Sequence, residues 1–297
     1  MKNSIDLNWD NYSELIDAIA RRRCVIVVGS GVSMHSKNKE GNHPPSWDGF
    51  LRGCIGNFNE EQVKFIEDLL KKLDYLTACE FIKDTIKEDK FERIIEDSFK
   101  GYQHAEIHRY IFQLDSSIVI SPNFDEIYDT YARTESQNSV IIKTFEDDDI
   151  AKYLQGGEHR LIIKTHGTIN NPKNLIFTRS EYAKARIKSS LLYDILKSLA
   201  ITHTFLFIGC GINDPDIRMI LEDLVNMHSR IPKHFMLIKK DSILNEMKDI
   251  IERTMSLTFV EYDKGENNDH SQLVIDLKNL VDSVEDERLA LKESLLW

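Results

Sequence analysis

The sequence has few cysteines, and their spacing excludes the common structural uses of that residue. Only Cys24, Cys54, Cys79 and Cys210 occur in 297 residues, and none belongs to a C-x-x-C pair. A four-cysteine zinc ribbon needs two close pairs to place four thiolates around one ion, so no metal site is expected. A chain of this length also needs no disulfide scaffold, and we expect four buried free thiols in a reducing compartment.

Proline, glycine and long apolar runs are also scarce. With 6 prolines and 13 glycines the chain does not resemble a fibrous or disordered protein. The most apolar strip, residues 205–212, has eight residues, whereas a membrane span needs about 20. The N-terminal MKNSIDLNWD has no apolar signal core. We therefore expect a cytoplasmic protein without a membrane segment.

Positive charge is in deficit. Lys plus Arg is 38 against 49 for Asp plus Glu, which leaves a net charge of −11. Direct nucleic-acid binding is not expected, because the neutralisation of phosphates needs clustered cations. Hydrophobic residues make up 41% of the chain, enough for a sizeable core. The length fits one large α/β domain over residues 1–297.

Short β-branched and aromatic runs alternate with helical patterns along the chain. The predicted strands cover residues 25–28, 118–120, 140–143, 161–164, 204–208, 235–238 and 257–261. Several are apolar throughout, which is typical of strands covered by helices on both faces. Strand–helix alternation of this kind predicts an α/β fold with a doubly wound, mostly parallel, Rossmann-like sheet.

Two helical regions stand apart from the alternation. Residues 59–102 show only helical periodicity, which predicts a helical insertion after the first strand. A helix over about 270–296 ends the chain, followed by Trp297. That terminal tryptophan, like Trp9 near the other end, either docks on its own domain or contacts a second subunit. The second alternative predicts a homo-oligomer.

The first strand leads into a glycine-rich loop, V-V-G-S-G-V-S. Glycines at the carboxyl end of a strand let the backbone turn and approach a pyrophosphate, a role we expect for Gly29 and Gly31. The hydroxyls of Ser30 and Ser33 are candidate donors to phosphate or ribose. A tight turn without a ligand is the alternative, because the third glycine of the dinucleotide fingerprint is missing.

Polar side chains follow two further strands. S-P-N-F-D places Asn123 and Asp125 after the second strand, and K-T-H-G-T places His166 after the fourth. Ligands of open α/β sheets bind at the carboxyl edge, so these three side chains are the candidate catalytic residues.

A second glycine pair follows the fifth strand, in F-I-G-C-G-I-N-D-P-D-I. Gly209, Cys210 and Gly211 are expected to border a bound adenosine or ribose. For Asp214 we favour a structural role, as the cap of a helix that has Pro215 at its first position.

These elements, in this order, resemble the sirtuin superfamily. The G-S-G-V-S loop is similar to the family's G-A-G-x-S, and S-P-N-F-D to its T-x-N-x-D, with Asn123 and Asp125 at the matching positions. Residues 164–167 match the His-Gly element, and residues 44–47 resemble its Pro/Trp-containing segment. The second glycine pair is similar to that of the bacterial sirtuin-like branch. The match spans roughly residues 22–238.

One departure from the family separates its activities. Sirtuin deacylases carry a zinc ribbon that helps to form the acyl-lysine cleft, and this sequence lacks its cysteines. The resemblance is therefore to the bacterial sirtuin-like enzymes that hydrolyse NAD in defence against phage. It implies NAD as substrate, no metal, and regulation through self-assembly or a separate partner, such as a HerA-type ATPase or an Argonaute-type protein.

The resemblance implies an NAD glycohydrolase that releases nicotinamide and ADP-ribose. In that mechanism Asn123 holds the ribose or the attacking water, His166 takes a proton, and Asp125 orients the ribose or only fixes its loop. Two alternatives remain: a module that senses NAD or ADP-ribose without turnover, and an NAD-dependent protein deacylase.

Overall fold

The computed structural model describes residues 6–154, 159–212, 214–228, 231–265 and 269–294. Its centre is a seven-stranded sheet in the order β3-β4-β2-β1-β5-β6-β7, and every neighbouring pair is parallel. The strands are β1 Cys24–Val28, β2 Ile118–Ser121, β3 Ile141–Thr144, β4 Leu161–Lys164, β5 Thr204–Ile208, β6 His234–Lys239 and β7 Leu257–Tyr262. The predicted α/β, doubly wound, Rossmann-like fold is confirmed.

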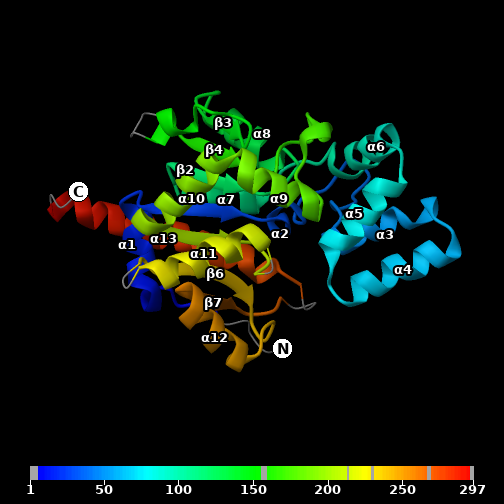
Figure 1. The fold of residues 1–297 in the computed structure, drawn as a ribbon. Helices are drawn as coiled ribbons and strands as arrows, with labels where there is room; N and C mark the ends of the chain where they lie inside the picture. The colour runs from blue at the N-terminus through cyan, green and yellow to red at the C-terminus, as the bar shows by residue number, and fades with distance from the viewer. Residues whose placement is uncertain (1–5, 155–158, 213, 229–230, 266–268, 295–297) are drawn as a thin grey trace.

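Helices cover both faces of the sheet, which explains why the strands are apolar throughout (Figure 1). In β1, Ile26 and Val28 join the core on one face, whereas Val25 and Val27 join the core on the other. The first core is closed by α1 Ser13–Ala20, α7 Glu106–Gln113, α8 Ile127–Glu135 and α13 Ser271–Ser294. The second is closed by α10 Ser190–Thr202, α11 Pro215–Met227 and α12 Asn245–Met255.

Four helices form an insertion between β1 and β2, and Figure 1 shows them beside the sheet rather than over either face. They are α3 Trp47–Gly53, α4 Glu60–Lys71, α5 Tyr75–Thr85 and α6 Glu88–Phe99. The insertion starts earlier than residue 59, because Ser46 caps the short helix α3 by accepting a hydrogen bond from the Gly49 amide. Its helices share a core of their own, which Phe124 and Phe177 join from the sheet side.

The helix at the end of the described chain packs on its own domain. Leu273, Leu277 and Leu280 of α13 are buried in the first core, and the Trp9 indole donates a hydrogen bond of 2.9 Å to the carbonyl of Asp276. Trp9 therefore docks within the domain. Trp297 lies outside the described residues. None of the described helices has both the length and the apolar character that crossing a membrane requires.

The order of the strands predicts where a ligand crevice lies, beside the carboxyl end of β1. The chain leaves β1 toward β2 on one side, while β5 pairs with β1 on the other, so the winding reverses beside β1. The loops that follow β1, β2, β4 and β5 therefore meet at one edge of the sheet, where parallel α/β folds bind their ligands.

Candidate active site

A cleft of about 440 Å³ opens at this edge of the sheet, between the strand ends and the helical insertion. Its lining includes six of the ten predicted site residues, which are Ser30, Asn123, Asp125, His166, Cys210 and Gly211. The two catalytic candidates from different strand ends, Asn123 and His166, thus face one space. The other predicted residues, Gly29, Gly31, Ser33 and Gly209, support this lining from behind.

The glycines let two loops interlock. A Cβ atom at Gly29 would lie 2.4 Å from the carbonyl oxygen of Gly209, and one at Gly209 would lie 2.5 Å from the Val32 nitrogen. Gly209 also has a φ of +65°, which side chains other than glycine rarely adopt. The Gly31 amide donates a hydrogen bond of 2.9 Å to the Gly209 carbonyl. Close packing of backbone on backbone accounts for these three glycines, whereas a Cβ at Gly211 would meet open space.

A hydrogen-bond chain ties Asn123 to the first loop. The Asn123 amide donates to the Ser33 hydroxyl at 3.2 Å, and that hydroxyl donates to an Asp125 carboxylate oxygen at 2.8 Å. The other Asp125 oxygen accepts from the Ile127 amide at 3.1 Å. Both Asp125 oxygens are thus engaged inside the protein, which favours a role in fixing the loop.

Below this chain lies a buried ion pair that the sequence reasoning missed. The Lys164 ammonium is 2.8 Å from the Asp129 carboxylate and donates to the Asp125 carbonyl at 2.6 Å, with side-chain exposures of 1% for Lys164 and 3% for Asp129. Burial raises the pKa of Asp129, and the adjacent Lys164 opposes that shift. A lysine in the apolar strand β4 was the available signal, because a buried charge needs a partner.

His166 is buried among polar groups from the start of α11, from α9 and from the loop after β2. Its Nε2 lies 3.5 Å from an Asp216 oxygen, and its Nδ1 lies 3.4 Å from the Tyr182 hydroxyl. Burial by itself lowers the pKa of His166, but the Asp216 carboxylate and the nearby Asp214 charge outweigh it and raise that pKa above the ordinary value of 6.5. His166 is among the residues predicted from the sequence, whereas Asp216 and Tyr182 beside it are not, although Asp216 belongs to the D-P-D-I motif.

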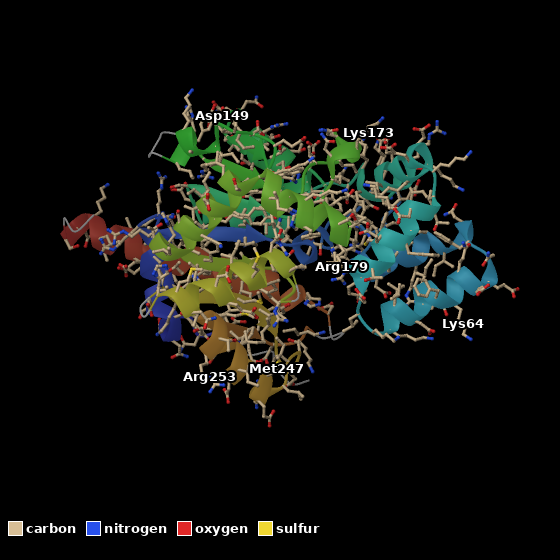
Figure 2. The ribbon with its side chains drawn as sticks, in the orientation of Figure 1. Lys64, Asp149, Lys173, Arg179, Met247 and Arg253 are labelled. Atoms are coloured by element: carbon tan, nitrogen blue, oxygen red, sulfur yellow. The ribbon has the colours of Figure 1, made fainter. Side chains whose placement is uncertain are left out.

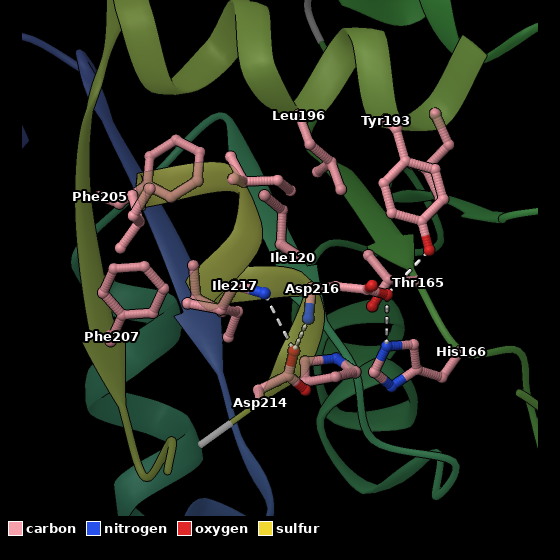
Figure 3. A pocket seen from close by; sticks show the side chains of 15 residues that line it. Ile120, Thr165, His166, Tyr193, Leu196, Phe205, Phe207, Asp214, Asp216 and Ile217 are labelled. Atoms are coloured by element: carbon pink, nitrogen blue, oxygen red, sulfur yellow. Dashed lines mark hydrogen bonds and ion pairs between the residues drawn. The ribbon is translucent and has the colours of Figure 1, made fainter. Parts of the chain in front are cut away.

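Asp214 caps α11 as expected. One of its oxygens accepts from the amides of Asp216 at 3.0 Å and Ile217 at 3.1 Å, and Pro215 occupies the first helical position (Figure 3). Behind His166, a small apolar cavity of about 40 Å³ separates this cap from the sheet. Phe205, Phe207 and Leu196 are among its walls.

The outer wall of the cleft is held by a polar seam between α5 and α9 Arg179–Lys188. Asp74, Thr77, Glu80 and Lys83 recur every third residue along one face of α5, and each contacts the first residues of α9. Arg179 lies 2.8 Å from Asp74, where the insertion meets the rest of the molecule (Figure 2).

The four thiols are free, as expected. Cys24, Cys54 and Cys79 are buried, while Cys210 is partly buried and lines the cleft. Burial raises the pKa of Cys210, so its thiol stays protonated at neutral pH. Across the residues that the structure describes, no group of three or more His, Cys, Asp or Glu is placed to hold a metal ion.

Comparison with known proteins finds similarity over much of this chain. Residues 117–260 match the family model described as a SIR2-like domain. The NAD(+) hydrolase ThsA of Enterococcus faecium is 24% identical over 212 residues, and that of Cytobacillus dafuensis is 23% identical over 209. Defense-associated sirtuin 2 of Bacillus subtilis is 23% identical over 218 residues. Each alignment covers 70% of this chain.

The chain matches only part of these relatives, namely 41% and 39% of the two hydrolases and 20% of the defence sirtuin. A solved structure of cytosolic 5′-nucleotidase IIIB with cytidine aligns over 97% of this chain and 96% of its own, at 11% identity and a TM-score of 0.39. That TM-score is below the level that indicates a shared fold. The expected resemblance of this sequence to sirtuin-like proteins, among them NAD(+) hydrolases and a defense-associated sirtuin, is confirmed by the family model and the sequence relatives.

Proposed function

We propose that this chain, whose residues 117–260 match the SIR2-like domain model, is an NAD glycohydrolase that releases nicotinamide and ADP-ribose. The observation that carries the proposal is the meeting of Asn123 and His166, from two different strand ends, in one cleft. NAD(+) hydrolases among the relatives support the substrate.

The chemistry demands little acid catalysis. In NAD the nicotinamide ring is a cationic pyridinium, so it departs readily as neutral nicotinamide. The enzyme therefore has to orient NAD, stabilise positive charge at the anomeric carbon and guide a water molecule. Asp125 lines the cleft with both oxygens hydrogen-bonded inside the protein, so it fixes the loop that carries Asn123. Asn123, whose amide already donates to Ser33, holds the ribose or the water. His166 takes the proton that the water loses as its oxygen bonds to carbon.

Two alternatives are weaker. An NAD-sensing module needs the cleft but has no use for an amide and an imidazole at the reacting end. A deacylase needs a second cleft for acyl-lysine, which in sirtuins is formed with a zinc ribbon. The segment between β1 and β2 here contains the amphipathic helices of the insertion, which share an apolar core of their own.

Substitution of the two catalytic candidates tests the proposal. We expect Asn123→Ala and His166→Ala each to reduce nicotinamide release from NAD by at least about 100-fold, the usual contribution of a positioned acid or base. Chromatography of the reaction measures the release. His228→Ala, at an exposed position after α11, is the matched control and retains wild-type activity. Wild-type turnover in His166→Ala would remove that residue from the mechanism.

The wider role follows from the relatives. We propose that NAD depletion by this chain serves anti-phage defence and that it acts as a homo-oligomer or with a separate ATPase or Argonaute-type partner. Defense-associated sirtuin 2 supports the defence role. Light scattering of the purified chain tests the oligomer, and a monomeric mass at micromolar concentration would reject it.

A further inference from the structure

A carboxylate that the mechanism above does not use borders the His166 ring. Asp216 lies in the first turn of α11 and is 6% exposed. One of its oxygens accepts from Arg186 Nε of α9 at 3.0 Å, and the other accepts from the Tyr193 hydroxyl of α10 at 2.8 Å. That second oxygen is the one that lies 3.5 Å from His166 Nε2 (Figure 3).

Hydrogen bonds from Arg186 of α9 and Tyr193 of α10 hold this carboxylate in one orientation. A fixed carboxylate beside one imidazole nitrogen selects the tautomer that carries its proton there, which leaves the other nitrogen free to accept a proton. For His166 that other nitrogen is Nδ1, which lies 3.4 Å from the Tyr182 hydroxyl. The start of α11 also favours a negative charge, because the helix dipole is positive at that end.

We propose that Asp216, clamped by Arg186 and Tyr193, is the positioning residue for His166. It orients the imidazole and stabilises the imidazolium that forms when His166 takes the proton from water. This inference rests on the proposed hydrolysis of NAD.

The charges around the ring support it. The ring faces Asp216 and the Asp214 cap from α11, Tyr182 from α9, and the Pro122 carbonyl from the loop after β2. Burial raises the pKa of Asp216, but His166, Tyr193 and Arg186 together hold that pKa below its ordinary value, so the carboxylate stays charged. The protonated form of His166 is therefore stabilised despite its burial.

The test compares Asp216→Asn with a matched substitution on the same helix. Asp223 of α11 pairs with Lys197 of α10 at 3.2 Å, so Asp223→Asn also removes a carboxylate that joins these two helices, but away from His166. With NAD as substrate we expect Asp216→Asn to lower kcat roughly 10- to 100-fold with KM within about twofold, a part of the contribution of a general base. Asp223→Asn keeps wild-type values.

The pH profile separates positioning from a structural role. His166 acts as a base only when it is unprotonated, so kcat falls as the pH drops through its pKa. The loss of the Asp216 charge lowers that pKa, and the acid limb of the Asp216→Asn profile moves to lower pH. A drop in kcat with an unmoved acid limb would overturn the proposal, because a structural defect changes activity at every pH.

An NMR titration of His166 makes the result independent of turnover. The pKa of His166 falls in Asp216→Asn and stays in place in Asp223→Asn. If wild-type protein leaves NAD intact, the proposed function fails, while this titration still decides whether Asp216 controls the ring. Should Asp216→Asn not fold, Tyr193→Phe replaces it. That substitution removes the hydrogen bond from the Tyr193 hydroxyl to Asp216 and leaves Asp216 and His166 in place. An unchanged pKa of His166 and unchanged kcat would then overturn the proposal.

Discussion

Single residues in this cleft divide into those that face the space and those that hold them. Asn123 and His166 line the cleft, and Ser33 and Lys164 fix the loops that carry them, while Asp125 both lines the cleft and fixes its loop. Lys164 is the extreme case, since its ammonium is buried and pairs with Asp129. A charge in such a position stabilises the protein only while its partner remains.

Removal of Lys164 therefore has a large cost. Lys164→Met leaves Asp129 buried without a counter-charge, and we expect a loss of about 3–5 kcal/mol in the free energy of unfolding, measured with urea. Lys197→Met, which breaks a half-exposed pair, costs less than about 1 kcal/mol. Equal losses in the two variants would contradict the assigned role of Lys164.

The candidate site was partly predictable at this scale. Asn123, Asp125 and His166 were found because each follows an apolar strand, and parallel strands end at one edge of the sheet. Asp216, Arg186 and the tyrosines around His166 were missed, because their meeting depends on how α9, α10 and α11 pack, which no local pattern encodes.

Among the elements, the loops after β1 and β5 carry the most exacting geometry. All seven strands were predictable, because continuous apolar runs between helical patterns identify buried parallel strands. That Gly29, Gly31 and Gly209 border a ligand stays a prediction, and the structure shows that these glycines also let two backbones come into contact. A sequence motif specifies small residues but not what approaches them.

This reading of the glycines predicts unequal effects. Gly209→Ala places a Cβ against the Val32 backbone at a positive φ, so we expect a loss of at least about 2 kcal/mol in the free energy of unfolding. Gly211→Ala, where a Cβ meets open space, stays within about 0.5 kcal/mol of wild type. Thermal or urea unfolding compares them, and a tolerant Gly209 would contradict the interlocked loops.

The seam between α5 and α9 governs the outer wall. Glu80 accepts from the Ser180 amide at 2.9 Å and from its hydroxyl at 2.6 Å, which anchors the start of α9 beside Arg179. We expect Glu80→Ala to raise KM for NAD about three- to tenfold with a smaller change in kcat, because two charge-assisted hydrogen bonds that shape the binding wall are lost. Glu88→Ala, exposed on α6, leaves both constants in place. A change confined to kcat would place the seam in catalysis rather than binding.

As a whole, the molecule combines a sheet whose strand ends carry the candidate catalytic residues with an insertion that borders the same cleft. The sequence does not predict that the insertion starts before residue 59, because α3 is a short capped helix without a long periodic pattern. Its Trp47 and Tyr75 complete a cleft whose floor is built by the strand ends.

One measurement tests the proposed hydrolysis most directly, namely proton NMR of NAD incubated with the purified protein. The account predicts that nicotinamide and ADP-ribose appear in equal amounts as NAD disappears, and that His166→Ala leaves the NAD signals intact. NAD that binds the wild-type cleft, seen by saturation transfer, and yet remains uncleaved at stoichiometric protein would contradict the account and favour a sensing role.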